Sequence, residues 1–243
     1  MKNLAVLVLV FAPLTAVADV ADNDDLATIR SQVGWGASIN PDRVGITGEG
    51  GYNGGAGRAT ANATLEATLF SRASVFANVD YGGIIDHARP ALGAAFQIID
   101  PRHGNYGLRA SFAYKPEGFT EPEGELEGAL VGSRRIGADA IRAMVAYGQD
   151  PDFNESDVEL GTSYLHRASG HLVVGGTVRF RKALKLKMGV VEPDWDFIAG
   201  AVGGVWFARH TRAELLVGAD AVAYPGRSTG TGAIGLVSIG TEL

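Results

Sequence analysis

The chain has 243 residues, no cysteine and a formal net charge of −6. A chain without cysteine has no disulfide framework, no thiolate nucleophile and no lipid-accepting cysteine after a signal peptide. The charges form no long block of one sign, so the sequence lacks the electrostatic footprint of nucleic-acid binding. The length suits one large domain.

The N-terminus has the three parts of a secretory signal peptide. Met1 and Lys2 give a short basic head, residues 4–11 are an unbroken apolar run, and residues 16–18 read Ala-Val-Ala before Asp19. The apolar run is about half the ~20 residues that a membrane-spanning helix needs. We therefore predict export with cleavage after Ala18; an N-terminal anchor helix is the alternative.

Residues 19–43 form a lead-in whose structure the sequence leaves open. The stretch 19–25 is acidic and predicted to be flexible. The stretch 29–39, which contains Trp35, allows three interpretations: a periplasmic lead-in, a segment inside a barrel lumen, or an additional strand.

From residue 44 onward, apolar and polar residues alternate in segment after segment. In residues 58–69, alanine and leucine occupy every second position, and threonine, asparagine and glutamate lie between them. Successive side chains of a strand point to opposite faces, so this segment has one apolar and one polar face, which a helix would mix. The pattern predicts twelve strands, at residues 44–52, 58–69, 74–81, 91–98, 106–114, 122–133, 138–148, 158–167, 171–181, 197–207, 212–223 and 231–241.

The connections between these segments alternate in length. No later segment is a run of eighteen apolar residues, so helices cannot carry the mature chain across a bilayer, whereas a closed barrel can. Outer-membrane barrels have short periplasmic turns, longer external loops and an even number of strands. Tight turns are predicted at 71–73, 101–104, 133–137, 168–170 and 209–211, and longer links at 82–88, 116–121, 149–155, 182–194 and 224–230.

The two faces of the segments differ in chemistry. Aromatic residues of the apolar face lie near strand ends, as in the two interfacial girdles of a membrane barrel, with Ala, Val and Leu between them. The other face carries charges of both signs, which fits a lumen; a solvated face of a soluble sheet is the alternative. The residues expected to face the lumen are Glu66, Asp80, Arg109, Lys115, Arg142, Glu159, Arg179, Arg181, Glu214 and Asp220.

Together, the signal peptide, the absence of cysteine, the alternation, the aromatic strand ends and the tight turns resemble the outer-membrane β-barrel class of Gram-negative bacteria. The resemblance is architectural and names no specific family. It implies an antiparallel, up-and-down transmembrane barrel over residues 44–243 with about twelve strands, ten or fourteen being the alternative counts. It also implies location in the outer membrane and contact with its lipid.

Two local patterns suggest other chemistry. Asp150, Asp152 and Asn154 place oxygen atoms at alternating positions, as in the first half of a calcium loop, but the residues expected at its sixth and twelfth positions are absent. A solvated turn is the preferred interpretation. Ser169 near His166 and His171 allows a lipid hydrolase, which would need a base within hydrogen-bond reach of the serine and a third group to orient that base. The serine is expected at a turn tip and the two histidines on opposite faces of their strands, which disfavours this interpretation.

The sequence therefore predicts a porin-like passive channel for small solutes or ions, without cofactor or enzymatic activity. A structural or surface-interaction barrel with a plugged lumen is the alternative, and a lipid-modifying enzyme is a further one. The solute, the protein partners and the oligomeric state have no signal in the sequence.

Overall fold

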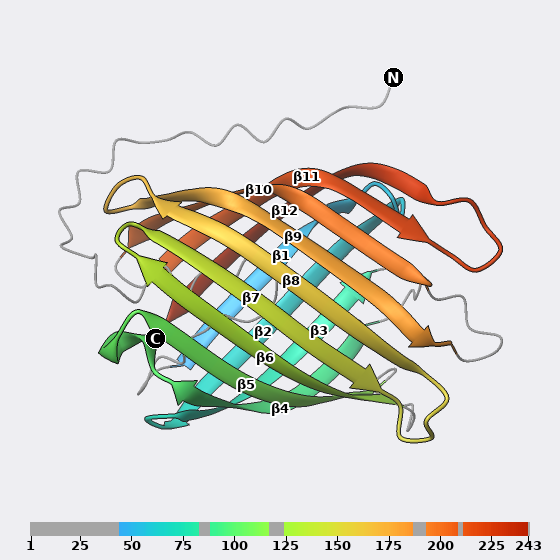
Figure 1. The fold of residues 1–243 in the computed structure, drawn as a ribbon, viewed down its shortest axis with the longest axis horizontal. Helices are drawn as coiled ribbons and strands as arrows, with labels where there is room; N and C mark the ends of the chain where they lie inside the picture. The colour runs from blue at the N-terminus through green and yellow to red at the C-terminus, as the bar shows by residue number, and fades with distance from the viewer. Residues whose placement is uncertain (1–43, 83–87, 117–123, 187–192, 209–210, 243) are drawn as a thin grey trace.

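The computed structural model describes residues 44–82, 88–116, 124–186, 193–208 and 211–242. Twelve antiparallel strands follow one another around a closed barrel, and the first pairs with the last (Figure 1). The predicted twelve-strand, all-β barrel is confirmed. The strands are β1 (Val44–Asn53), β2 (Arg58–Phe70), β3 (Ala73–Gly82), β4 (Ala88–Ile99), β5 (Tyr106–Pro116), β6 (Gly124–Ile136), β7 (Asp139–Gln149), β8 (Ser156–Arg167), β9 (Leu172–Lys185), β10 (Trp195–Ala208), β11 (Thr211–Ala223) and β12 (Gly230–Glu242), with a 3₁₀ helix, η1 (Pro101–His103), before β5.

Strand periodicity explains which side chains face inward. On β7, Ala140 and Met144 are buried, whereas Ile141 and Val145, each the next residue along the strand, are exposed. Because side chains alternate across a sheet, one set of positions fills the barrel and the other covers its outside. No helix of the described residues is long and apolar enough to cross a membrane.

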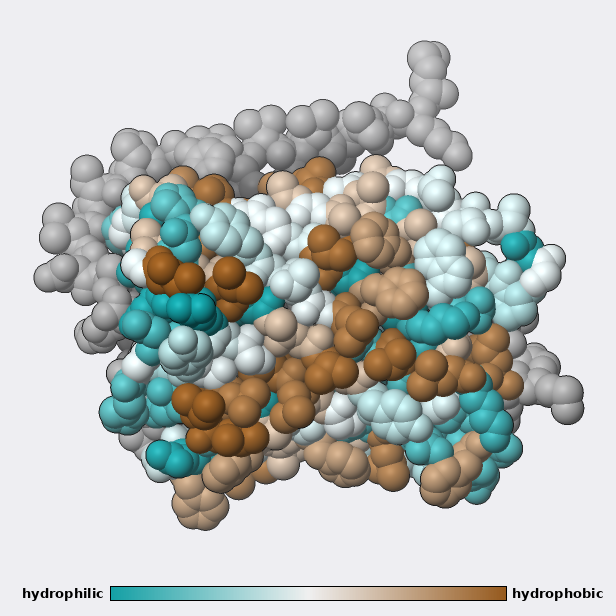
Figure 2. Space-filling view, in the orientation of Figure 1, coloured by the Kyte–Doolittle hydropathy of each residue, from teal (hydrophilic) through white to brown (hydrophobic). Residues whose placement is uncertain are grey.

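Large apolar side chains cover the outside of the barrel. Leu92, Leu130 and Val217, all in mid-strand, are exposed, and Figure 2 shows brown and white residues over the middle of the strands with more teal toward their ends. This is the outer surface that a barrel needs in lipid, and it confirms that the apolar face points outward. Most exposed aromatic residues of the strands lie toward the strand ends, and Phe112, in the middle of β5, is an exception. Tyr81, Tyr147 and Phe197 lie at one end, and Phe96, Tyr106, Tyr164 and Phe207 at the other.

The two ends of the barrel differ. At the turn end, β1 begins beside the end of β12, with Gly45 opposite Glu242, and the connections 71–72 and 137–138 are short. Gly137 there has a φ of +62°, a left-handed conformation that glycine adopts readily. The opposite end, here the loop end, carries the links 54–57, 150–155 and 224–229.

The strands extend further than the sequence pattern predicted. β4 begins at Ala88 rather than 91, and β9 continues to Lys185 rather than ending at 181. Lys182, predicted to begin a long loop, pairs with Trp195 of β10, and its Nζ lies 2.5 Å from Asp194 Oδ1. The pairing of β9 with β10 therefore continues beyond the residues in which apolar and polar side chains alternate.

Candidate functional site

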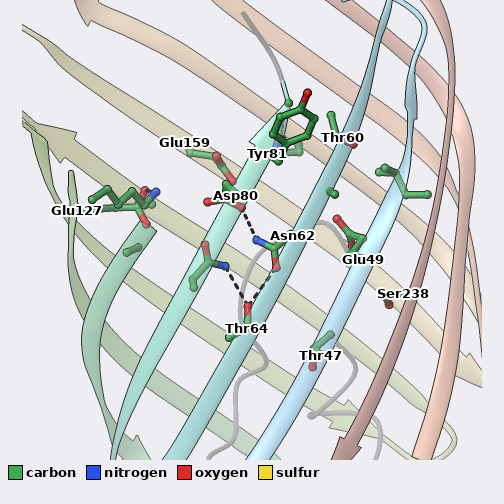
Figure 3. Close-up of a pocket in the computed structure, with 18 of the residues that line it drawn as sticks. Thr47, Glu49, Thr60, Asn62, Thr64, Asp80, Tyr81, Glu127, Glu159 and Ser238 are labelled. Carbon is green, nitrogen blue, oxygen red and sulfur yellow. Dashed lines mark hydrogen bonds and ion pairs between the residues drawn. The ribbon is translucent and has the colours of Figure 1, made fainter. Parts of the chain in front are cut away.

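The inside of the barrel holds a cavity of about 380 Å³, and residues from distant parts of the sequence share it (Figure 3). Four carboxylates and two cationic groups line it, which gives the lining a formal charge of −2. Four residues that we expected in a lumen are among these groups. The charged lining residues are Glu49, Asp80, Glu127, Glu159, Lys115 and Arg179.

One wall of the cavity is a hydrogen-bonded polar network on β2 and β3. The Asn62 amide donates to the Asp80 carboxylate, and Thr64 Oγ1 donates to Asn62 Oδ1 at 3.1 Å (Figure 3). Asn78 Nδ2 donates to Thr64 Oγ1 at 3.0 Å. These bonds fix the orientation of the polar side chains before any solute arrives, which lowers the entropic cost of binding.

Ion pairs hold the cationic groups of the cavity. Lys115 on β5 pairs with Glu127 on β6. Arg179 Nη2 on β9 lies 2.8 Å from Asp196 Oδ1 on β10. Both pairs join neighbouring strands, so each cation lies against the wall rather than extending across the lumen.

A second wall is apolar, which the sequence interpretation missed. Ile198, Ile234 and Leu236 line the cavity and are buried. They occupy the same alternating positions as the polar lumen residues, so the alternation of side chains along each strand could have identified them from the sequence. They belong to a larger inward-facing cluster with Leu165, Val173, Val202, Trp206 and Leu216.

Toward the turn end, the cavity is followed by a densely filled layer. Arg109 lies on β5 nearer the turn end than the cavity residue Ala113, and it is 1% exposed. Its Nη2 lies 2.7 Å from Glu66 Oε1, to which Ser74 Oγ also donates at 2.5 Å. Because β3 and β4 separate the strands of Glu66 and Arg109, the arginine crosses part of the lumen.

More charged groups lie at this level on the opposite side. Arg142 on β7 is buried, and its Nε donates to Ser163 Oγ at 3.3 Å. It is also attracted to Glu214 on β11, which Arg212 Nε contacts at 2.8 Å. Glu66, Arg109, Arg142 and Glu214, all buried, are here called, with their buried neighbours, the charged layer.

The remaining two residues of the predicted lumen set have structural partners. Arg181 pairs with Asp157 of β8. The Asp220 carboxylate accepts the Gly55 backbone N–H, with distances of 3.0 and 2.8 Å to its two oxygens. Asp220 thereby ties the 54–57 link to the inner wall of β11.

Replacing Asp220 with Ala is expected to release this link. A hydrogen bond to a charged group contributes roughly 1.5–3 kcal/mol, so the Gly55 amide should exchange its hydrogen about tenfold faster or more in the variant. Hydrogen exchange of residues 54–57 measures this change. Asp152→Ala, at an exposed position of another link, is the matched control. Equal exchange in both variants would show that Asp220 does not hold the link.

The structure shows the hydrogen-bond partners of the calcium-loop pattern at 150–154 and of the serine and histidines around residue 169. Asp150 Oδ1 accepts the backbone N–H groups of Asn154 and Glu155 at 2.6 and 3.1 Å, so it stabilises its own turn. Within the described residues, no cluster of three or more His, Cys, Asp or Glu could hold a metal. His166 Nδ1 lies 2.8 Å from Asp139 Oδ1, whereas Ser169 Oγ accepts the His171 backbone N–H at 3.3 Å.

Neither a protein-family model nor a curated protein sequence matches this chain. Solved structures do match it. The NanC porin has a TM-score of 0.60 at 9% identity, over 82% of this chain and 100% of that one. An outer-membrane channel from Pseudomonas putida F1 has a TM-score of 0.57 at 9% identity, over 85% and 97%. The KdgM porin, in a complex with disordered oligogalacturonate, has a TM-score of 0.56 at 9% identity, over 81% and 98%.

At these identities the similarity concerns the fold. These three proteins are outer-membrane porins or channels, and this chain is a closed barrel with an apolar outer surface. The chain therefore has the fold of outer-membrane β-barrel proteins.

Proposed function

We propose that this protein is a porin-like channel of the outer membrane that lets small solutes or ions pass passively, with its turn end toward the periplasm. The supporting observation is the polar cavity of about 380 Å³ inside a barrel whose outer surface is apolar. Short turns and both barrel termini lie on the periplasmic side in barrels of this kind. The formal charge of −2 in the cavity favours cations over anions.

The charged layer favours a second candidate function, a barrel with a closed lumen whose loops carry out its role. Arg109, Leu165 and Val173 are at most 1% exposed, as expected where side chains fill a cross-section. A twelve-strand barrel is wider than the eight-strand type that side chains just fill, so both states are compatible with its size. Current through a single barrel distinguishes them.

We expect discrete single-channel currents from the purified barrel in a planar bilayer. Ala129→Trp should reduce the conductance at least about twofold, because Ala129 lines the cavity and an indole ring would occupy much of it. The control is Leu130→Trp, since Leu130 is the next residue of β6 and is exposed on the outer face. It should leave the conductance unchanged.

Three outcomes separate the candidates. Reduced current in Ala129→Trp alone supports passage through the lumen. Equal currents in both variants would mean that ions do not pass through this cavity. No current from the unmodified barrel, together with correct folding, contradicts the channel and supports the closed barrel.

A further inference from the structure

Two carboxylates of the cavity, Asp80 and Glu159, differ from Glu127 in their partners. Lys115 is paired with Glu127, and Arg179 with Asp196. Among the described residues, Asp80 and Glu159 form no ion pair within 4 Å; Asp80 accepts a hydrogen bond from Asn62, and Glu159 is attracted to Arg179 over a longer distance. The cavity therefore presents negative charge that its own cations do not neutralise by contact.

A buried amide oxygen beside Asp80 is a further acceptor group in the cavity. Asn78 is only 7% exposed and lines the cavity, and its Nδ2 donates to Thr64. Its Oδ1 accepts no hydrogen bond from any of the residues that the structure describes. Asn78 and Asp80 are two residues apart on β3, so their side chains lie on the same face of the strand. Two acceptors side by side suit a ligand with more than one N–H donor.

The cavity also has apolar lining. The apolar lining residues are Ile198 on β10, Ile234 and Leu236 on β12, Met144 on β7, and Phe76 on β3 itself. A fully hydrated metal ion gains nothing from these side chains, whereas the hydrocarbon part of an organic molecule is removed from water there.

We propose that the cavity is a binding site for small organic cations, whose protonated amino or guanidino group contacts Asp80, Glu159 and the Asn78 amide oxygen while the apolar part packs on Ile198, Ile234 and Leu236. This proposal deepens the proposed channel function, because it names the class of solute that would dwell in the lumen. It does not depend on conduction, since a closed barrel with this cavity would bind the same molecules from the loop end.

The test compares butylammonium with butyrate, two probes of similar size and opposite charge. Isothermal titration calorimetry on the detergent-solubilised barrel, at pH 7.5 and constant NaCl concentration, measures binding, and current block in a planar bilayer measures dwell in the lumen. Butylammonium should bind and butyrate should not. Asp80→Asn with Glu159→Gln should weaken butylammonium binding about tenfold or more, since two charge-assisted contacts are lost. Asp152→Asn, which removes one carboxylate from an exposed link, is expected to bind like the unmodified barrel.

Each result decides one question. Equal binding of both probes, or butylammonium binding that survives the double substitution, overturns the site. Absence of butylammonium binding in constant NaCl also overturns it, because the cavity would then hold inorganic ions or none. Binding without current keeps the site and contradicts the channel, whereas current without binding keeps the channel and contradicts the site. Asn78→Leu, which keeps both carboxylates, should weaken binding separately; unchanged affinity in that variant removes Asn78 from the site.

Discussion

Arg109→Met should lower the free energy of unfolding by about 3–5 kcal/mol, because it leaves the Glu66 carboxylate buried without its cation. The guanidinium is 1% exposed and lies 2.7 Å from Glu66 Oε1. Water inside the lumen cannot easily replace it, since Glu66 is also buried. Urea titration of the barrel folded into lipid vesicles measures the loss.

Two further variants test this explanation. Arg72→Met removes an arginine that is exposed in the β2–β3 turn, and it should change the free energy of unfolding by less than about 0.5 kcal/mol. Glu66→Gln combined with Arg109→Met should be more stable than Arg109→Met alone, because no carboxylate is then left without a cation. If Arg109→Met behaves like Arg72→Met, the ion pair does not stabilise the charged layer.

Leu130→Arg should destabilise the folded barrel by about 2–4 kcal/mol, the cost of a cation on the lipid-facing surface near the bilayer midplane. Leu130 is exposed in the middle of β6. The same vesicle titration applies, because in detergent micelles the hydrophobic thickness is less well defined. This prediction tests directly whether lipid surrounds the barrel.

The control introduces an arginine at a different depth, near the surface of the membrane rather than at its midplane. Leu172→Arg, at the turn end of β9 and also exposed, should cost roughly 0–1 kcal/mol, because an arginine there reaches the interface. A soluble protein with a solvated outer surface would tolerate both substitutions equally. Equal small effects would therefore contradict membrane insertion.

The fold was largely predictable because successive side chains of a strand point to opposite faces, so the chemistry of each face appears in the sequence at every second residue. Alternation alone fits a soluble sheet as well, and the position of the aromatic residues resolved this choice: Tyr81 and Phe96 lie toward opposite strand ends, and both are exposed. The strand bounds were less accurate. β9 runs on to Lys185 because pairing with its neighbours continues, and one-dimensional periodicity contains no information on pairing.

The candidate site was predictable in composition but not in contacts. The alternation of side chains indicates that Glu66 and Arg109 share the inner face, yet they are 43 residues apart and lie on strands that are not neighbours in the sheet. Their contact depends on the register of every strand between them, which local sequence does not determine. The alternation of side chains also places Ile198 and Leu236 inside. Whether an apolar residue inside the barrel lines a cavity or packs against other side chains depends on its neighbours across the barrel, which the sequence does not give.

The seam between β1 and β12 has a consequence for assembly. Asn53 pairs with Ile234 and Gly45 with Glu242, so the barrel closes through contacts between the two ends of its sequence. Until β12 docks, β1 and β11 are open edges with unpaired backbone groups, which in lipid are costly and in water invite aggregation. Ring closure therefore depends on β12, the strand that comes last in the chain order of the barrel, and such long-range pairing is intrinsically slow. A chain that lacks β12 should accumulate as an open sheet dependent on chaperones.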